Sequence, residues 1–272
     1  MSTPHKTVDD YWREALPVFK QKMEIARDRE MEALLERMVA LCAFVTQNLE
    51  EKWTRERETA AHLNPMMVLA FDLLRGSWEA QRSLSMAAAS LCARTSFEIK
   101  VGFKFLTKSI HPKTYAERFF RYFDLERLKR HYSGFLPLEQ HEVDRITQVC
   151  SEWINPKTNR PRSRSSWHGK ETFKELCREV GEQHAYDQFY STASAFTHVS
   201  YAIHRAYLVG RSMQPVAKTT AVSQQSLLAV GNYAIFLMDY VRFFGVDVPP
   251  DEFAVILAAV KAQQPRLISE RG

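Results

Sequence analysis

Four residues with chemically useful side chains follow one another at intervals of four: Tyr186, Tyr190, Ser194 and His198. Residues four apart lie on the same face of an α-helix. One helix face would therefore carry two phenols, a hydroxyl and an imidazole. Such a set can hold a phosphate, position a water molecule or transfer a proton. The alternative is a buried, hydrogen-bonded network that fixes how two helices pack.

Arg94 and Glu98 form a second pair spaced by four, in a segment rich in alanine. A charged pair in such an apolar helix is either buried and matched or faces a pocket. Arginine suits this position because its guanidinium binds a carboxylate or a phosphate through two N–H groups. We therefore expect Arg94 to bind an anion, or Arg94 and Glu98 together to orient His198. The alternative is a structural salt bridge.

The string Trp167-His168-Gly169-Lys170 comes directly before a predicted helix. The N-terminus of a helix with a lysine beside it can bind an anion, so Trp167 and Lys170 are candidate ligand-binding residues. A tryptophan next to a loop can instead anchor that loop to the core. Arg162 and His168 also form an Arg-x5-His string, which we interpret as a coincidence because it falls in a Pro/Ser/Arg loop.

The chain lacks the motifs of several large enzyme classes: it contains no G-x-x-x-x-G-K-[ST], G-x-G-x-x-G, H-E-x-x-H or G-x-S-x-G. We therefore expect no metal and no cofactor. The four cysteines, Cys42, Cys92, Cys150 and Cys177, are widely spaced and form no C-x-x-C pair. This spacing indicates buried thiols in a reducing compartment.

The chain of 272 residues is 45% hydrophobic, enough for one sizeable core, and its net charge is +5. The basic excess is uneven: the segment from Lys100 to Arg130 contains nine Lys or Arg and three Asp or Glu. This permits an anionic partner. The N-terminus is polar and no run of 18 apolar residues occurs, so we expect no membrane span and a cytoplasmic location.

Apolar residues recur at three- and four-residue steps along nearly the whole chain, and no stretch alternates convincingly as a strand. The sequence predicts an all-α fold, an irregular bundle of about eight or nine helices with a long N-terminal helix. We expect an N-terminal helical extension (1–60), a bundle domain (61–264) and a flexible tail (265–272). Predicted helices cover 8–53, 64–74, 78–108, 113–131, 137–154, 170–180, 184–209, 221–244 and 250–262, with breaks at Asn64-Pro65 and Gly76-Ser77 and a loop at 155–166.

Three motifs together resemble a bacterial all-helical family that is catalogued only as a domain of unknown function. They are Arg94-x3-Glu98, Trp167-x-Gly169-Lys170 and Tyr190-x3-Ser194-x3-His198, and the resemblance covers about 71–207. It implies a helical domain whose Arg, Glu, Tyr and His side chains cluster in space. Some helical bacterial proteins of this kind are compared with HEPN ribonucleases and are found in defence settings. The helical Arg-x4-6-His motif of the HEPN group is missing here, so this is a fold-level analogy.

Two functions remain open from the sequence. In the first, Arg94, Glu98 and His198 are catalytic, while Tyr186, Tyr190, Ser194, Trp167 and Lys170 bind RNA or a small anionic ligand, with nuclease-like activity in stress or phage defence. In the second, the chain is a non-catalytic scaffold or oligomerisation module whose polar cluster is structural. Its long N-terminal helix would then mediate a homodimer.

Overall fold

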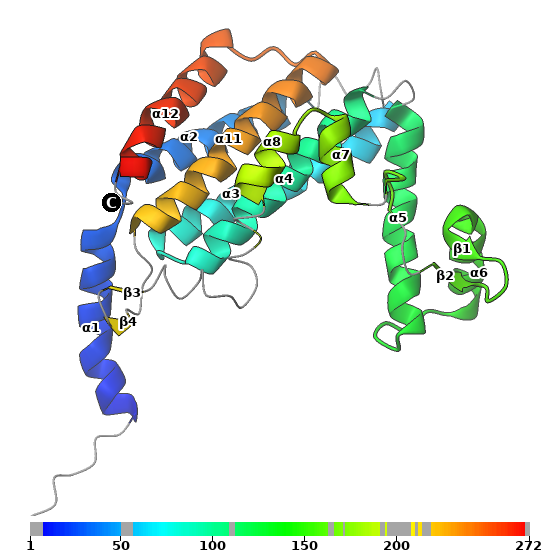
Figure 1. The fold of residues 1–272 in the computed structure, drawn as a ribbon, viewed down its shortest axis with the longest axis horizontal. Helices are drawn as coiled ribbons and strands as arrows, with labels where there is room; N and C mark the ends of the chain where they lie inside the picture. The colour runs from blue at the N-terminus through cyan, green and yellow to red at the C-terminus, as the bar shows by residue number, and fades with distance from the viewer. Residues whose placement is uncertain are drawn as a thin grey trace, which may run out of the picture.

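The computed structural model describes residues 8–49, 57–108, 112–162, 166–170, 172–190, 194, 208–209, 212–213 and 219–269. Within these ranges the fold is an all-α bundle with two very short β-hairpins, which confirms the predicted fold class (Figure 1). The helices are α1 (Val8–Ala26), α2 (Arg29–Leu49), α3 (Arg57–Arg82), α4 (Met86–Lys108), α5 (Pro112–Tyr132), α6 (Gln140–Val149), α7 (Phe173–Glu179), α8 (Gln183–Ala185), α11 (Thr219–Phe244) and α12 (Pro250–Ser269).

Shorter elements connect these helices. A 3-10 turn, η1 (Ser151–Trp153), follows α6, and a π-helical turn, η2 (Tyr186–Tyr190), continues α8. Strand β1 (Ile154–Asn155) pairs antiparallel with β2 (Arg160–Pro161), and β3 (Leu208–Val209) pairs antiparallel with β4 (Ser212–Met213). The expectation of helix throughout 137–154 and 184–209 was therefore wrong at the C-terminal end of each range. In each case the final residues turn into a hairpin, where strand pairing replaces the helical hydrogen bonds.

The break between the third and fourth helices lies later than the sequence predicts. Helix α3 runs through both Asn64-Pro65 and Gly76-Ser77, and the chain turns at 83–85, where Leu84 adopts a φ of +50°. Gly76 serves packing instead: a Cβ atom there would lie 3.3 Å from the Sγ atom of Cys92 on α4. The glycine thus permits the close approach of α3 and α4, a role that a single sequence does not distinguish from a helix break.

One hydrophobic core joins α2, α3, α4, α11 and α12. At its centre, the ring of Phe103 on α4 lies 5.2 Å from that of Phe236 and 5.4 Å from that of Tyr240, both on α11. Of the predicted N-terminal extension, α2 lies inside this core, since Leu35 and Met38 are fully buried. Helix α1 extends away from the bundle (Figure 1).

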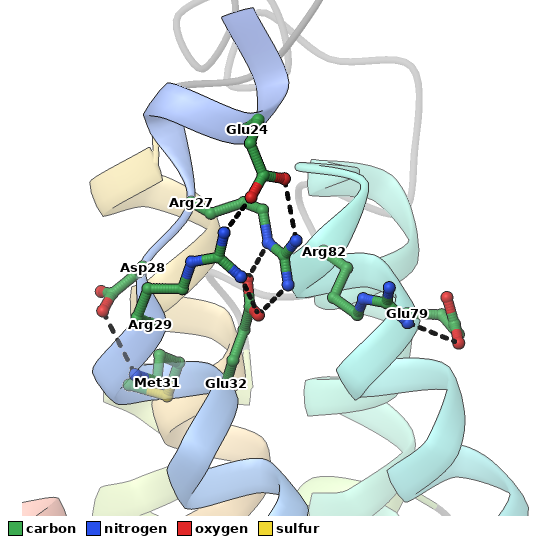
Figure 2. Close-up of polar contacts among 8 residues, drawn as sticks. All are labelled: Glu24, Arg27, Asp28, Arg29, Met31, Glu32, Glu79 and Arg82. Carbon is green, nitrogen blue, oxygen red and sulfur yellow. Dashed lines mark hydrogen bonds and ion pairs between the residues drawn. The ribbon is translucent and has the colours of Figure 1, made fainter. Parts of the chain in front are cut away.

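The junction of α1 and α2 is built from polar contacts (Figure 2). The carboxylate of Asp28 accepts a hydrogen bond from the backbone N–H of Met31 (3.2 Å), as an N-cap of α2 does. The side chain of Ser223 donates to the same carboxylate (2.8 Å) and accepts from Gln81 (3.1 Å). Arg27 pairs with both Glu24 and Glu32, as Figure 2 shows. The single uninterrupted N-terminal helix that the periodicity predicts is therefore two helices, with these contacts at their junction.

Helices α5 and α6, the turn η1 and the first hairpin form an arm beside the bundle (Figure 1). The arm has a small core of its own in which Leu125, Leu128, Ile146 and Trp153 are buried. Helix α5 contacts α3 and α4, and its aromatic residue Phe119 packs against the main core. The arm therefore places one aromatic wall against the face of α4 that carries Glu98.

The segment of α7, α8 and η2 is held against α4 by a buried ion triad. The carboxylate of Glu182, which is 12% exposed, accepts from Nζ of Lys100 (2.9 Å) and also pairs with Lys104. Nζ of Lys108 donates to the backbone carbonyl of Val180 (3.2 Å). The three lysines, which are spaced by four on α4, thus bind the chain that follows α7. Gly181, which has a positive φ, ends α7 as predicted.

Helix α11 is the one described helix that is long and apolar enough to cross a membrane by length and composition. Half of its most apolar window is buried inside the structure, and the helix packs chiefly against α4 at the centre of the bundle. This is the position of a core helix, where burial against other helices accounts for the apolar composition.

We predict that Glu182→Gln lowers the free energy of unfolding by about 3 kcal/mol at pH 7, because Lys100 stays buried without its counter-charge. Burial acts to raise the pKa of Glu182, but the two lysines outweigh it and hold that pKa below its usual value. The stabilisation is therefore present above the carboxylate's unfolded pKa and is lost as the pH falls through the lower folded value. Urea unfolding at pH 7 and at about pH 3 measures both effects.

The exposed Glu36 on α2 provides the matched control. Glu36→Gln removes the same charge and should change the free energy of unfolding by less than about 0.5 kcal/mol. If the two variants lose equal stability at pH 7, the ion triad does not hold the α7–η2 segment in place.

Candidate functional site

Arg94, Glu98 and Tyr190 meet, as the resemblance implies. Nε of Arg94 donates to Oε1 of Glu98 (3.0 Å), and the Tyr190 hydroxyl donates to the same oxygen (2.6 Å). The Arg94 guanidinium also lies over the Tyr190 ring, 5.3 Å from its centroid. The side chains of Arg94 and Glu98 are 29% and 36% exposed, so this pair faces a pocket or solvent and is not sealed in the core.

The two phenols of the predicted stripe also lie together. The rings of Tyr186 and Tyr190 stack at 5.0 Å with an angle of 21° between their planes. Phe97 of α4 and Phe173 of α7 pack on Tyr190 at 5.6 and 5.0 Å. A π-helical turn carries both tyrosines, and such turns recur at functional sites.

The other two members of the stripe are less fully placed. Ser194 is half-buried, while His198 lies outside the described residues. The predicted roles of His198 as an acid or base, and of Arg94 and Glu98 as its partners, remain predictions. Burial and the hydrogen bond to Glu98 both raise the pKa of Tyr190, so its hydroxyl stays protonated and acts as a donor.

An apolar pocket of about 420 Å³ lies beside this cluster and includes Glu98 in its lining. Such a volume suits a small organic ligand. Helices α3, α4, α5 and α7 and the turn at 167–168 contribute its walls. The lining residues are Met66, Leu69, Thr95, Glu98, Ile99, Gly102, Phe119, Phe123, Trp167, His168, Phe173 and Leu176.

Trp167 both anchors its loop to the core and lines the pocket. The two alternatives for this residue, an anchor or a ligand-binding residue, are therefore compatible. Its ring contacts Phe119 at 5.1 Å and Phe105 at 5.8 Å, edge to face. Gly102 on α4 lies against the indole: a Cβ atom at that position would make an ordinary contact with the indole at 3.5 Å and a tight contact with Met66 at 3.3 Å. A side chain at position 102 would therefore require Met66 to shift.

His168 is a pocket residue that the sequence analysis missed. Its Nδ1 accepts a hydrogen bond from the backbone N–H of Lys170 (3.1 Å), which assigns the proton of the neutral ring to Nε2. Burial, together with the charges of Lys170 and Arg118, lowers its pKa to about 4. The imidazole is therefore neutral at physiological pH. Its only sequence signal is its place beside Trp167 and Gly169, in a turn whose glycine has a φ of +75°.

Lys170 takes a different position from the one its motif indicates. Its ammonium pairs with Glu179 at the other end of α7, and it is not among the residues that line the pocket. Helix α7 begins with a capping box in which Thr172 and Glu175 exchange hydrogen bonds (3.2 Å each). The N-terminus of this seven-residue helix is thus capped by its own chain.

No three His, Cys, Asp or Glu side chains in the described ranges gather closely enough to hold a metal ion. What the site offers is one carboxylate with a fixed orientation, one neutral imidazole and a set of aromatic walls. Such a site can accept hydrogen bonds from a ligand and stack against a flat ring.

We expect Tyr190→Phe to lower the free energy of unfolding by about 1–2 kcal/mol, because it removes a half-buried hydrogen bond to a carboxylate. Tyr186→Phe is the matched control, since this phenol stacks on Tyr190 and its hydroxyl has no hydrogen bond among the described residues. Urea unfolding at pH 7 compares the two variants. Equal losses would show that the hydroxyl of Tyr190 contributes nothing specific.

The His168 imidazole should titrate with a pKa of about 4 in an NMR pH titration, far below the usual 6.5. The unfolded chain takes up this proton first, so the folded state loses stability as the pH falls from about 6.5 towards 4. His168→Gln should flatten the pH dependence of the free energy of unfolding in that window. A pKa near 6.5 would contradict the burial of the ring.

Residues 80–214 match the sequence model of a family of unknown function, DUF5677. This range includes Arg94, Glu98, Trp167, Tyr190 and His198, and it is close to the range of 71–207 that the three motifs indicate. A search of curated proteins and a search of solved structures each returned no match. The analogy with HEPN ribonucleases is not confirmed by this match. The match confirms the resemblance drawn from the motifs: residues 80–214 are similar to a family of unknown function, DUF5677.

Proposed function

We propose that the chain is a binding protein whose pocket takes a small organic molecule with a flat ring and an N–H donor, the chemistry of a nucleobase. The observation that supports this proposal most directly is the position of Glu98. Its carboxylate lies in the lining of an otherwise largely aromatic and aliphatic pocket, with one oxygen oriented by Arg94 and Tyr190.

The arrangement of Glu98 favours a donor on the ligand. Both protein hydrogen bonds reach Oε1, and no described residue donates to Oε2. The Glu98 side chain is 36% exposed beside apolar walls, so a ligand N–H that reaches Oε2 replaces water with a charge-assisted hydrogen bond. Phe119, Trp167 and Phe173 provide ring faces and edges against which a flat ligand packs.

The sequence also predicts an anionic ligand or RNA, and in this proposal Arg94 is the residue that binds the anionic group. Among the described residues that line the pocket, Glu98 alone is charged, since His168 is neutral, so the pocket itself suits a neutral or cationic group. Arg94 is not among the lining residues but contacts Glu98, and its guanidinium would bind a phosphate attached to a bound base. A nucleotide, free or at an unpaired position of RNA, therefore satisfies both features. Nuclease-like activity in stress or phage defence, and a cytoplasmic location, remain proposals of the same kind.

Intrinsic fluorescence tests this function because Trp167 lies in the pocket. The probes are the four common ribonucleosides, their 5′-monophosphates and benzylamine as an aromatic amine whose emission does not overlap that of tryptophan. We expect at least one to bind saturably, and Glu98→Gln to weaken it about tenfold through loss of one charge-assisted hydrogen bond. Trp167→Phe should abolish the fluorescence change. Arg94→Ala should remove any preference for a monophosphate over its nucleoside.

The exposed Glu36 on α2 is again the charge-matched control, and Glu36→Gln should bind as the parent chain does. If no probe saturates, or if Glu98→Gln binds every probe equally well, the proposed pocket function is wrong.

That result would favour a non-catalytic interaction module instead. The packing of Phe97 and Phe173 on Tyr190 and the exposure of Val18 (52%) and Ile25 (78%) on α1 support this second candidate. In that case the tyrosines are structural, and α1 offers apolar side chains for a homodimer.

A further inference from the structure

A second hollow lies on another face of α4, where the basic stretch found in the sequence is concentrated. Lys100, Lys104 and Lys108 are spaced by four and therefore share one face of the helix. Glu98 is six residues before Lys104, so it lies on a different face. Glu182 neutralises part of the lysine stripe, since it pairs with Lys100 and Lys104 only.

Helix α11 brings a further cation to this face. Arg242 and Asp239 line the hollow opposite the lysines, and Phe243 adds an apolar edge. The volume of the hollow is about 500 Å³. Its lining consists of Lys104, Thr107, Lys108, Asp239, Arg242 and Phe243.

The charges around the hollow do not balance. Three cations, Lys104, Lys108 and Arg242, face the single carboxylate of Asp239. Among the described residues, neither Asp239 nor Arg242 forms an ion pair or a side-chain hydrogen bond, although both line the same hollow. Like charges gathered in this way destabilise the chain unless an anion neutralises them.

Asp239 is poorly solvated in this position. Burial raises its pKa and Glu182 acts in the same direction, although Lys104, Arg242 and Lys108 act against them. The surrounding cations therefore do not compensate fully for the burial of this carboxylate. Its charge also opposes the entry of an anion into the hollow.

Basic residues elsewhere on the structure are paired differently. On the arm and around α7, cations form ion pairs with neighbouring carboxylates, as Arg118 does with Glu152 (2.8 Å) and Lys174 with Asp187 (2.9 Å). The other such cations are Arg121, Arg127, Lys129, Arg145 and Lys170. Arg130, Lys157 and Arg162 on the arm form no ion pair among the described residues. The hollow beside α4 differs from the arm because cations from two helices line one cavity there.

We propose that this hollow binds the phosphoryl group of a small phosphorylated molecule. The Arg242 guanidinium and the ammonium groups of Lys104 and Lys108 donate to its oxygen atoms. The hydroxyl of Thr107 donates to the backbone carbonyl of Phe103 (3.0 Å), so it is not counted among the donors. A compact phosphoryl group fits three converging cations, whereas the backbone of a nucleic acid requires cations spaced along a path.

Isothermal titration calorimetry at low ionic strength tests the proposal, with inorganic phosphate and pyrophosphate as probes. We expect one site per chain, and pyrophosphate to bind more tightly because it carries more charge. Lys108→Ala and Arg242→Ala should each weaken pyrophosphate about fivefold or more. Asp239→Asn should strengthen it, because the substitution removes a repelling charge. Lys108 and Arg242 are exposed, so thermal melts should show both variants folded.

Lys157, exposed in the β1–β2 turn, is the charge-matched control, and Lys157→Ala should bind pyrophosphate as the parent chain does. Glu98→Gln should also leave this binding unchanged, which separates the hollow from the nucleobase pocket. Equal losses in Lys157→Ala and Arg242→Ala would overturn the proposal, since binding would then follow net charge alone. Binding of single-stranded RNA without binding of pyrophosphate would overturn it as well.

Discussion

The carboxylate of Glu182 joins two lysines of α4 and thereby positions the walls of both pockets. Its contacts with Lys100 and Lys104 fix the turn that follows α7, so Phe173 and Tyr190 on either side of this turn come to lie against α4. Lys100 is almost fully buried, and burial lowers its pKa while Glu182 acts in the opposite direction. Two desolvated charges must therefore stay in contact, which makes this docking specific.

The contacts of Glu182 also separate the lysines of α4 into two groups, one structural and one that lines the hollow. Lys100 is committed entirely to the structure, because its ammonium group is buried against Glu182 and the ring of Phe97 (4.7 Å). Lys104 lies at the border, since it pairs with Glu182 and also lines the hollow beside Arg242. The position along the stripe thus decides whether a lysine holds the fold together or faces solvent where an anion can reach it.

Local spacing predicted a good part of the candidate site. Arg94 and Glu98 pair because residues four apart on a helix are neighbours, and Tyr186 stacks on Tyr190 for the same reason. The break at Gly76 was wrong because glycine also serves close packing between helices. His168 was missed because its low pKa arises chiefly from burial, which depends on the tertiary structure; the charges of the neighbouring Lys170 and of the distant Arg118 add to it.

The sequence by itself determines that the chain is helical and which side chains share a helix face, because both follow from interactions within a few residues. It also determines the excess of positive charge along α4. Which faces meet is decided by contacts between distant segments. Only folding brings Tyr190 to Glu98, Trp167 to Gly102 and Arg242 to Lys108, because burial and charge at each place depend on side chains from several helices at once.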